Sequence, residues 1–173
     1  MRTNPTDVIR AIERAFDGIG RPKTSLRQFR LTDQKGMSGF ISDEEWEDAG
    51  KNRIDSKWQD IPDDEIEECH VVLAHMEAEE FRYYLPAYMR YGIKHHTTPL
   101  WKSDVLGSTV FAVYPSSRDP HLREYVLSQL SLLNSAQRSS VVQFLQFVAD
   151  YVEDARRPDA QVALDRYWKK LKE

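Results

Sequence analysis

Signals that start helices recur along the chain, and they constrain its fold more than any other feature. The pair Asn4–Pro5 combines a good cap with a residue suited to the first helical position, and Asp119–Pro120 repeats this pattern. Ser42 and Glu45 have the spacing of a capping box. Apolar residues follow both proline signals at every third or fourth position, as on the buried face of a helix. The sequence therefore predicts a mainly helical fold.

Most of the chain can be assigned to predicted helices. They run from Asn4 to Gly18, from Ser42 to Gly50, from Pro62 to Met76, from Ser103 or Asp104 to Phe111, from Asp119 to Leu133, from Ser135 to Arg157 and from Pro158 to Leu171. Trp46 is the expected buried anchor of the second of these helices. There is no internal repeat and no linker long enough to divide domains, so residues 1–173 are expected to form one compact domain.

Two segments also fit short strands. Leu26, Phe29 and Leu31 are compatible with a strand within residues 23–32. Residues 109–114 contain valine and phenylalanine, which favour strands, and this interpretation competes with the helix that ends at Phe111. The fold prediction is therefore a single multi-helix domain that leaves room for one or two short strands near 23–32 or 109–114.

A proline interrupts the densest aromatic stretch of the chain, residues 79–94. Aromatic residues such as Tyr84 and Tyr88 return there at helical spacing. Pro86 has no N–H to donate, and its ring clashes with the preceding turn of a helix. We therefore expect a short helix, a break near Leu85 and a second helix that begins at Pro86.

The composition is typical of an intracellular globular protein. Hydrophobic residues make up 40% of the chain and charged residues 30%. Cys69 is the only cysteine, which excludes an internal disulfide framework and a cysteine-rich zinc site. The N-terminal residues lack the apolar core and cleavage site of a secretory signal, and no apolar run approaches the roughly 20 residues that span a bilayer. We therefore expect a cytoplasmic protein without membrane contact.

Acidic residues are concentrated in the segment Asp43–Glu80. Fifteen acidic and three basic residues give it a net charge of −12, whereas the whole chain carries −4. Such a segment either neutralises itself against the basic remainder of the fold or forms an acidic face for a basic partner. In the second case Glu44, Glu47, Asp63 and Asp64 are candidate partner-binding residues. An acidic face repels nucleic acid, and the basic residues elsewhere form no dense run, so no nucleic-acid partner is expected.

The familiar catalytic and metal motifs fail on their spacing. Residues 18–24 contain two glycines and a lysine but lack the spacing of a phosphate loop. Glu67 and His70 form one E-x-x-H motif, whereas a carboxylate di-iron bundle needs two. Cys69 and His70 are adjacent and would point about 100° apart on a helix, which is unsuitable for a catalytic dyad. We therefore predict no catalytic residue, no metal and no cofactor, and favour a protein that is not an enzyme.

The tyrosines at 83, 84, 88 and 91 allow two interpretations. Helical periodicity makes Tyr84, Tyr88 and Tyr91 candidates for the core. Arg82 and Tyr83 then fall on the outer side of that helix, and both residue types are common anchors of protein interfaces. Arg82 and Tyr83 are therefore further candidate partner-binding residues.

Several short runs of the sequence together resemble a known family. The most specific is EFRYYLPAY at 80–88; weaker ones are KWQDI at 57–61, DVLGSTVF at 104–111, SAQ at 135–137, FL at 144–145 and ALDRYW at 163–168. On these residues the chain resembles the family of bacterial proteins catalogued as domain of unknown function 6714, over nearly its whole length. The resemblance implies a bacterial origin and one compact domain, and it carries no activity or catalytic residue.

Two hypotheses from different classes of function follow. The first is a non-enzymatic protein-binding domain, such as an immunity-type protein that neutralises a basic toxin through an acidic face. The second is an enzyme or small-ligand-binding protein whose site lies near the kinked helix Tyr83–Tyr91, where a proline break frees backbone groups beside His75, His95 or His96. The acidic segment and the failed catalytic motifs favour the first hypothesis.

Overall fold

The computed structural model describes residues 3–36, 39–116 and 118–171, and all structural statements refer to them. The α-helices are α1 (Pro5–Ala15), α2 (Leu26–Lys35), α3 (Asp43–Gly50), α4 (Asp63–Glu68), α5 (Ala78–Lys94), α6 (Val105–Ala112), α7 (Pro120–Leu130), α8 (Ser135–Tyr151) and α9 (Arg156–Arg166). Three 3-10 turns accompany them: η1 (Trp58–Asp60), η2 (Val72–His75) and η3 (Trp168–Lys170). The predicted mainly helical fold is confirmed. Within the described ranges, no helix is long and apolar enough to cross a membrane.

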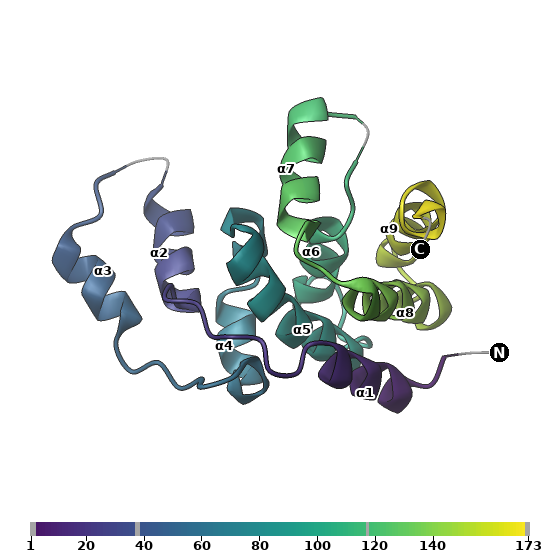
Figure 1. Ribbon diagram of the computed structural model, residues 1–173, viewed down its shortest axis with the longest axis horizontal. Helices are drawn as coiled ribbons and strands as arrows, with labels where there is room; N and C mark the ends of the chain where they lie inside the picture. Colours follow the sequence, from purple (N-terminus) through teal and green to yellow (C-terminus); the bar gives the residue numbers. More distant parts are fainter. Residues whose placement is uncertain (1–2, 37–38, 117, 172–173) are drawn as a thin grey trace.

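Helix α5 lies at the centre of the fold (Figure 1). It packs against α1, α4, α6, α7 and α8, and against η1 and η2. Seven consecutive residues, from Tyr83 to Met89, are all buried, so this part of the helix is enclosed on every side. Helices α1, α8 and α9 lie to one side of α5, and the α2–α3 pair lies to the other (Figure 1). The helices therefore share one apolar core that is built around α5.

Pro86 lies inside α5 without interrupting it, so the predicted break near Leu85 is wrong. The helix continues past the proline to Lys94. Because Pro86 has no N–H, the carbonyl of Arg82 loses its usual hydrogen bond within the helix. Most helical stability in a protein comes from tertiary packing, and burial on both sides of the proline outweighs this loss.

Helix α2 takes the place of the strand considered for residues 23–32, which is thereby corrected. Ser25 Oγ accepts a hydrogen bond from the Gln28 N–H, and Gln28 Oε1 accepts one from the Ser25 N–H. This reciprocal pair is a complete capping box. Leu26 and Phe29 then lie one turn apart and are both buried. The S-x-x-Q spacing is the sequence signal that decides for a helix here.

Residues 109–114 do not form the strand considered for them. Helix α6 covers this region up to Ala112, in agreement with the competing prediction of a helix. Val105 and Thr109 are buried one turn apart, and Thr109 Oγ1 donates to the Val105 carbonyl at 2.7 Å. Phe111 lies on the other side of the helix and is 56% exposed. No β-strand occurs in the described part of the chain.

The junction between α8 and α9 differs from the prediction. Helix α8 ends at Tyr151, and α9 begins at Arg156 rather than at Pro158. Arg156 is buried because its guanidinium donates to both carboxylate oxygens of Asp154, at 2.5–3.1 Å, and to the Thr98 carbonyl at 3.0 Å. This ion pair fixes the corner between the two helices.

Helices α1 and α7 begin where the sequence predicts. Asn4 Oδ1 accepts a hydrogen bond from the Thr6 N–H at 2.9 Å, and Asp119 Oδ1 accepts one from the His121 N–H at 2.9 Å. One detail of α7 was not expected. Leu122, predicted to face inward, is 37% exposed.

Gln137 joins three helices inside the core. It is fully buried in the first turn of α8. Its Oε1 accepts hydrogen bonds from Arg82 Nε on α5 and from the Asn134 N–H, each at 3.1 Å. Its Nε2 donates to the Ala15 carbonyl at the end of α1, also at 3.1 Å. One side chain therefore holds the ends of α1 and α8 against α5.

Replacing Gln137 with alanine should lower the free energy of unfolding by about 2–4 kcal/mol, because it removes three hydrogen bonds and leaves the Ala15 carbonyl unpaired. Urea denaturation followed by circular dichroism measures the change. Gln143→Ala on the same helix is the matched control. Gln143 is half-buried and makes no side-chain hydrogen bond with the described residues, so its loss should stay near or below about 0.5 kcal/mol. Equal losses from the two variants would contradict the proposed role of Gln137.

Candidate functional site

Helix α3 is strongly acidic and stands at the edge of the molecule (Figure 1). Five of its eight residues, DEEWEDAG, are acidic. The helix packs against α2, and none of its residues is buried. Trp46 is only half-buried, which corrects the prediction of a buried anchor. The physical reason is that α3 packs along one side only.

Hydrogen bonds nevertheless fix α3 to α2. Gln28 Nε2, on α2, donates to the Trp46 carbonyl at 3.1 Å. Lys35 Nζ, at the end of α2, forms an ion pair with Glu45. The predicted capping box of Ser42 and Glu45 is present. The two helices therefore form a hairpin that holds α3 in a defined orientation.

Three acids of α3 share one side of the helix. Asp43 and Glu44 precede Glu47 by four and three residues, which places the carboxylates next to each other. All three are exposed, and none forms an ion pair with the described residues. Phe40 and Ile54 flank the helix and are 86% and 64% exposed. We call these five residues the α3 surface.

The apolar part of the α3 surface is as informative as its charge. Phe40, Ile54 and Trp101 are the most exposed large hydrophobic residues of the described chain. Two of these three flank one acidic helix. Covering such side chains with another protein is favourable, because it removes apolar surface from water. Protein interfaces usually combine apolar contact area with polar and charged residues, and the α3 surface contains both.

Part of the remaining acidic segment pairs with basic residues of the fold. Asp55 and Arg53 form a buried ion pair, with 2.9 Å between Oδ1 and Nε. Glu68 pairs with Arg30 of α2, with 3.4 Å between Oε2 and Nη1. The interpretation that the segment neutralises itself within the fold therefore holds for several acids, and the acidic face for a partner stays a prediction. Several acids fold against basic residues, while α3 keeps three unpaired carboxylates on one side.

Asp63 and Asp64 lie in the first turn of α4, apart from α3 (Figure 1). Asp63 Oδ2 accepts a hydrogen bond from Lys94 Nζ at 2.9 Å and lies 2.8 Å from His95 Nε2. Partial burial opposes ionisation of Asp63, but these two contacts hold its pKa below the usual value. Asp64 is exposed. The structure therefore does not join the α4 acids and the α3 acids into one face.

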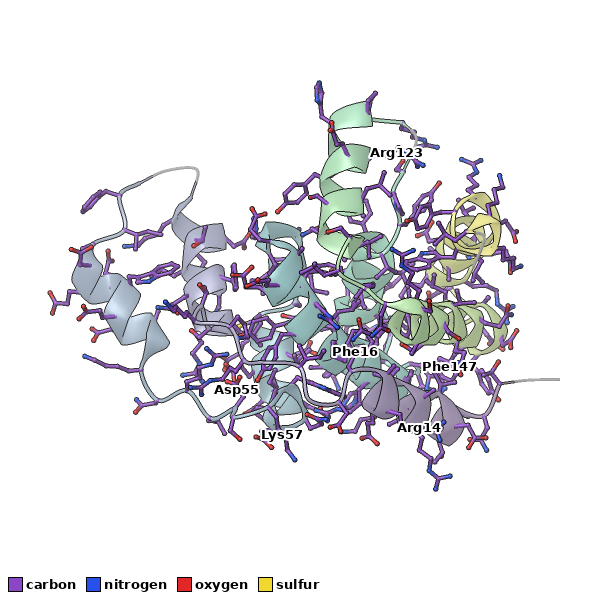
Figure 2. All side chains as sticks on the ribbon, viewed as in Figure 1. Arg14, Phe16, Asp55, Lys57, Arg123 and Phe147 are labelled. Atoms are coloured by element: carbon purple, nitrogen blue, oxygen red, sulfur yellow. The ribbon has the colours of Figure 1, made fainter. Side chains whose placement is uncertain are left out.

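Tyr83 is fully buried, so the prediction that it lies on the outer side of its helix is wrong. Its hydroxyl donates to Asp55 Oδ2 at 2.7 Å, and Asp55 also accepts two hydrogen bonds of 2.9 Å from Arg53. Arg53 in turn donates to the Tyr84 hydroxyl at 2.8 Å. Asp55 is buried, whereas Lys57, two residues later, is exposed at the lower edge of the view in Figure 2. Burial and the hydrogen bond to Asp55 raise the pKa of Tyr83. Tyr83 belongs to a buried network and cannot contact a partner in this conformation.

Arg82 is half-buried, and its Nε is engaged by Gln137. Among the six predicted partner-binding residues, the exposed ones are therefore Glu44, Glu47 and Asp64. Their role in binding stays a prediction.

The other tyrosines of α5 are core residues, as helical periodicity predicts. Their hydroxyls donate to the Thr24 carbonyl (Tyr84, 2.8 Å), to the Cys69 carbonyl (Tyr88, 2.5 Å) and to the Glu67 carboxylate (Tyr91). Side chains fill the region around Tyr83–Tyr91, and the hydroxyls already have partners. The structure therefore shows no open site at the place that the enzyme hypothesis chose.

The histidines named in the enzyme hypothesis make separate contacts. His75 Nε2 lies 2.7 Å from Asp33 Oδ1, and His96 Nδ1 lies 2.8 Å from the Ile93 carbonyl. Across the described ranges, no three histidine, cysteine or carboxylate side chains are grouped so that they could hold a metal ion.

Cys69 lies at the end of α4 and is 1% exposed. Burial, reinforced by the nearby Glu65 carboxylate, raises the pKa of the Cys69 thiol to about 12. Since the thiolate is the reactive form, little of it exists near neutral pH.

Iodoacetamide should therefore alkylate Cys69 in the native chain at least about 100-fold more slowly than in the denatured chain, because reaction requires unfolding. Mass spectrometry of timed samples at pH 8 measures the two rates, with the same chain in guanidinium chloride as the control. Alkylation of the native chain at the denatured rate would show that the thiol is accessible.

A cavity of about 560 Å³ opens between η2, α6 and the start of α9. Its polar lining includes His70, Asp104, Arg156 and Asp159. These residues come from three distant parts of the chain and form no motif, so no sequence pattern indicated this cavity.

Fold and surfaces together define a small helical domain with an acidic helix at its edge and a cavity beside α6. A family model described as "Family of unknown function (DUF6714)" matches residues 4–172, and the chain belongs to this family. The resemblance inferred from the EFRYYLPAY run and the weaker matches is thus confirmed. No curated protein and no solved structure matches the chain.

Proposed function

We propose that this chain is a non-enzymatic protein-binding domain that uses the α3 surface to bind a partner with a basic surface. One observation carries the proposal. Helix α3 is fixed to α2 by hydrogen bonds, yet none of its residues is buried. It carries exposed carboxylates that form no ion pair with the described residues, and exposed apolar residues precede and follow it in the sequence. A helix that is held in a fixed orientation and is still exposed is suited to form one side of a protein–protein interface.

The charge and the apolar residues of the α3 surface have different roles in this proposal. Asp43, Glu44 and Glu47 attract a basic partner and raise its rate of association. Phe40 and Ile54 provide the apolar contact area that lowers the rate of dissociation. Such an interface should be tight at low salt and weaker at high salt.

The most specific form of the proposal is an immunity-type protein that covers a basic toxin. The acidic helix would face the positive surface that such a toxin uses for its own substrate. The bacterial origin and the cytoplasmic location inferred from the sequence stay predictions that belong to this form.

The alternative of an enzyme or small-ligand site near Tyr83–Tyr91 has less support. The tyrosine side chains there are buried, and their hydroxyls bond to neighbouring segments of the fold. The exposed α3 surface favours the binding hypothesis.

The test begins with the tagged chain expressed in its native host and recovered together with bound protein. The captured protein is identified by mass spectrometry, purified, and its affinity for the chain is measured at about 0.1 M and about 0.5 M salt. We expect the double substitution Glu44→Lys and Glu47→Lys to weaken binding about tenfold or more at the lower salt concentration, because it replaces attraction by repulsion.

The matched control reverses two other exposed acids, Glu124 on α7 and Glu153 after α8, and so changes the net charge equally. Binding to this control variant should stay close to that of the natural chain. An equal effect of both pairs would mean that only net charge matters. Binding that is independent of salt and unaffected by reversal at Glu44 and Glu47 would overturn the proposal.

A further inference from the structure

The cavity beside α6 is separate from the α3 surface. Helix α3 is at the left edge of Figure 1, whereas α6 and α9 lie in its right half. The cavity has a volume of about 560 Å³, within the range of about 300–1,000 Å³ that is usual for small-molecule sites. A second cavity of about 460 Å³ continues along α6 and shares Gly107, Phe111 and Asp159 with the first.

The walls of the first cavity are largely apolar. Val71 and Leu73 of the η2 region form one part of the wall, and Leu100 forms another. Phe111 projects from α6 and is 56% exposed, so its ring is available to a ligand. Gly107 and Ser108 keep the floor low because their side chains are small or absent. The space therefore suits an apolar group of moderate size.

The charges that line this cavity favour a cation. Asp104 and Asp159 form no ion pair with the described residues. A Cβ placed on Gly107 would lie 2.1 Å from Asp104 Oδ1, so this carboxylate is folded over the start of α6. Burial raises the pKa of Asp104 although the Arg156 charge opposes this effect. A carboxylate in such a position gains more from a bound cation than one in water does.

An anionic ligand would need Arg156, the basic lining residue, to be free. Its guanidinium is instead held by both oxygens of Asp154 and by the Thr98 carbonyl. Asp154 offsets much of the Arg156 charge, whereas the carboxylates of Asp104 and Asp159 form no ion pair with the described residues. An anion would be repelled by both.

We propose that this cavity binds a primary ammonium group carried on an apolar stem, with Asp104 and Asp159 as counter-ions and Phe111 against the stem and the cation. Charge pairing at a partly desolvated carboxylate and a cation–π contact would act together. The ligand is either a free arylalkyl amine or the lysine side chain of a peptide, and both present the same chemistry.

Titration of the full chain with 4-phenylbutylamine, followed by amide NMR shifts, tests this inference. We expect saturable shifts at Gly107 and its neighbours, with a dissociation constant on the order of 1 mM or lower. The neutral alcohol and the carboxylate with the same stem should bind about tenfold more weakly or worse. Comparison with N-acetyl-lysine N-methylamide distinguishes the two sources. Tighter binding of this blocked lysine points to a peptide, and tighter binding of 4-phenylbutylamine points to a free amine.

Asp104→Asn is the decisive variant, because asparagine has nearly the same size and shape as aspartate but carries no charge. It should weaken amine binding about tenfold or more. Gly107→Ala should weaken it as well by displacing the Asp104 carboxylate. The control Glu44→Gln, on the α3 surface, should leave amine binding unchanged, so this inference and the proposed function can fail separately. Absence of saturable binding, equal binding of all three congeners, or full affinity in Asp104→Asn would overturn the inference.

Discussion

Helix α5 is enclosed by other helices along most of its length, and it carries four tyrosines into that interior. A buried hydroxyl without a hydrogen bond would be costly, so each one must find a partner. The partners are Asp55, the Thr24 carbonyl, the Cys69 carbonyl and Glu67. They lie in the segments before α2, before η1 and in or after α4. The tyrosines of α5 therefore fix loops that have few regular contacts of their own.

The EFRYYLPAY run, the most specific mark of the family, is consequently part of the structural interior. Phe81 is buried, Arg82 contacts Gln137, and Tyr83 and Tyr84 belong to the Arg53–Asp55 network. These residues hold the domain together, and the binding that we propose would take place at its periphery. Helix α3, attached through the α2–α3 hairpin, and the cavity beside α6 are the peripheral features with chemistry to offer. Both features depend on α5, because α6 packs against it and Phe29 of α2 contacts Tyr84 of α5.

The sequence was a good guide where local signals and burial agree. The caps at Asn4, Ser42 and Asp119 predicted three helix starts. A cap is a local interaction, because its side-chain oxygen accepts a hydrogen bond from the first turn of the helix whatever the rest of the helix packs against. It failed where tertiary packing decides. Burial of α5 overrides the helix-breaking tendency of Pro86, and a partner 28 residues away, Asp55, draws Tyr83 inward. The α3 acids were predictable as a charged segment, but their exposure follows from the one-sided packing of α3. The cavity residues come from distant segments, which no local pattern connects.

A rigid interior built on α5 holds a peripheral α3 that we propose to be free to bind a partner. Amide hydrogen exchange of the full chain, read residue by residue, tests this arrangement most directly. We predict that the amides of α5 on both sides of Pro86 exchange only through global unfolding, while those of α3 exchange through a local opening of lower free energy, because α3 buries no residue. Exchange of α5 through local opening near Pro86, or protection of α3 equal to that of α5, would contradict this division between interior and binding surface.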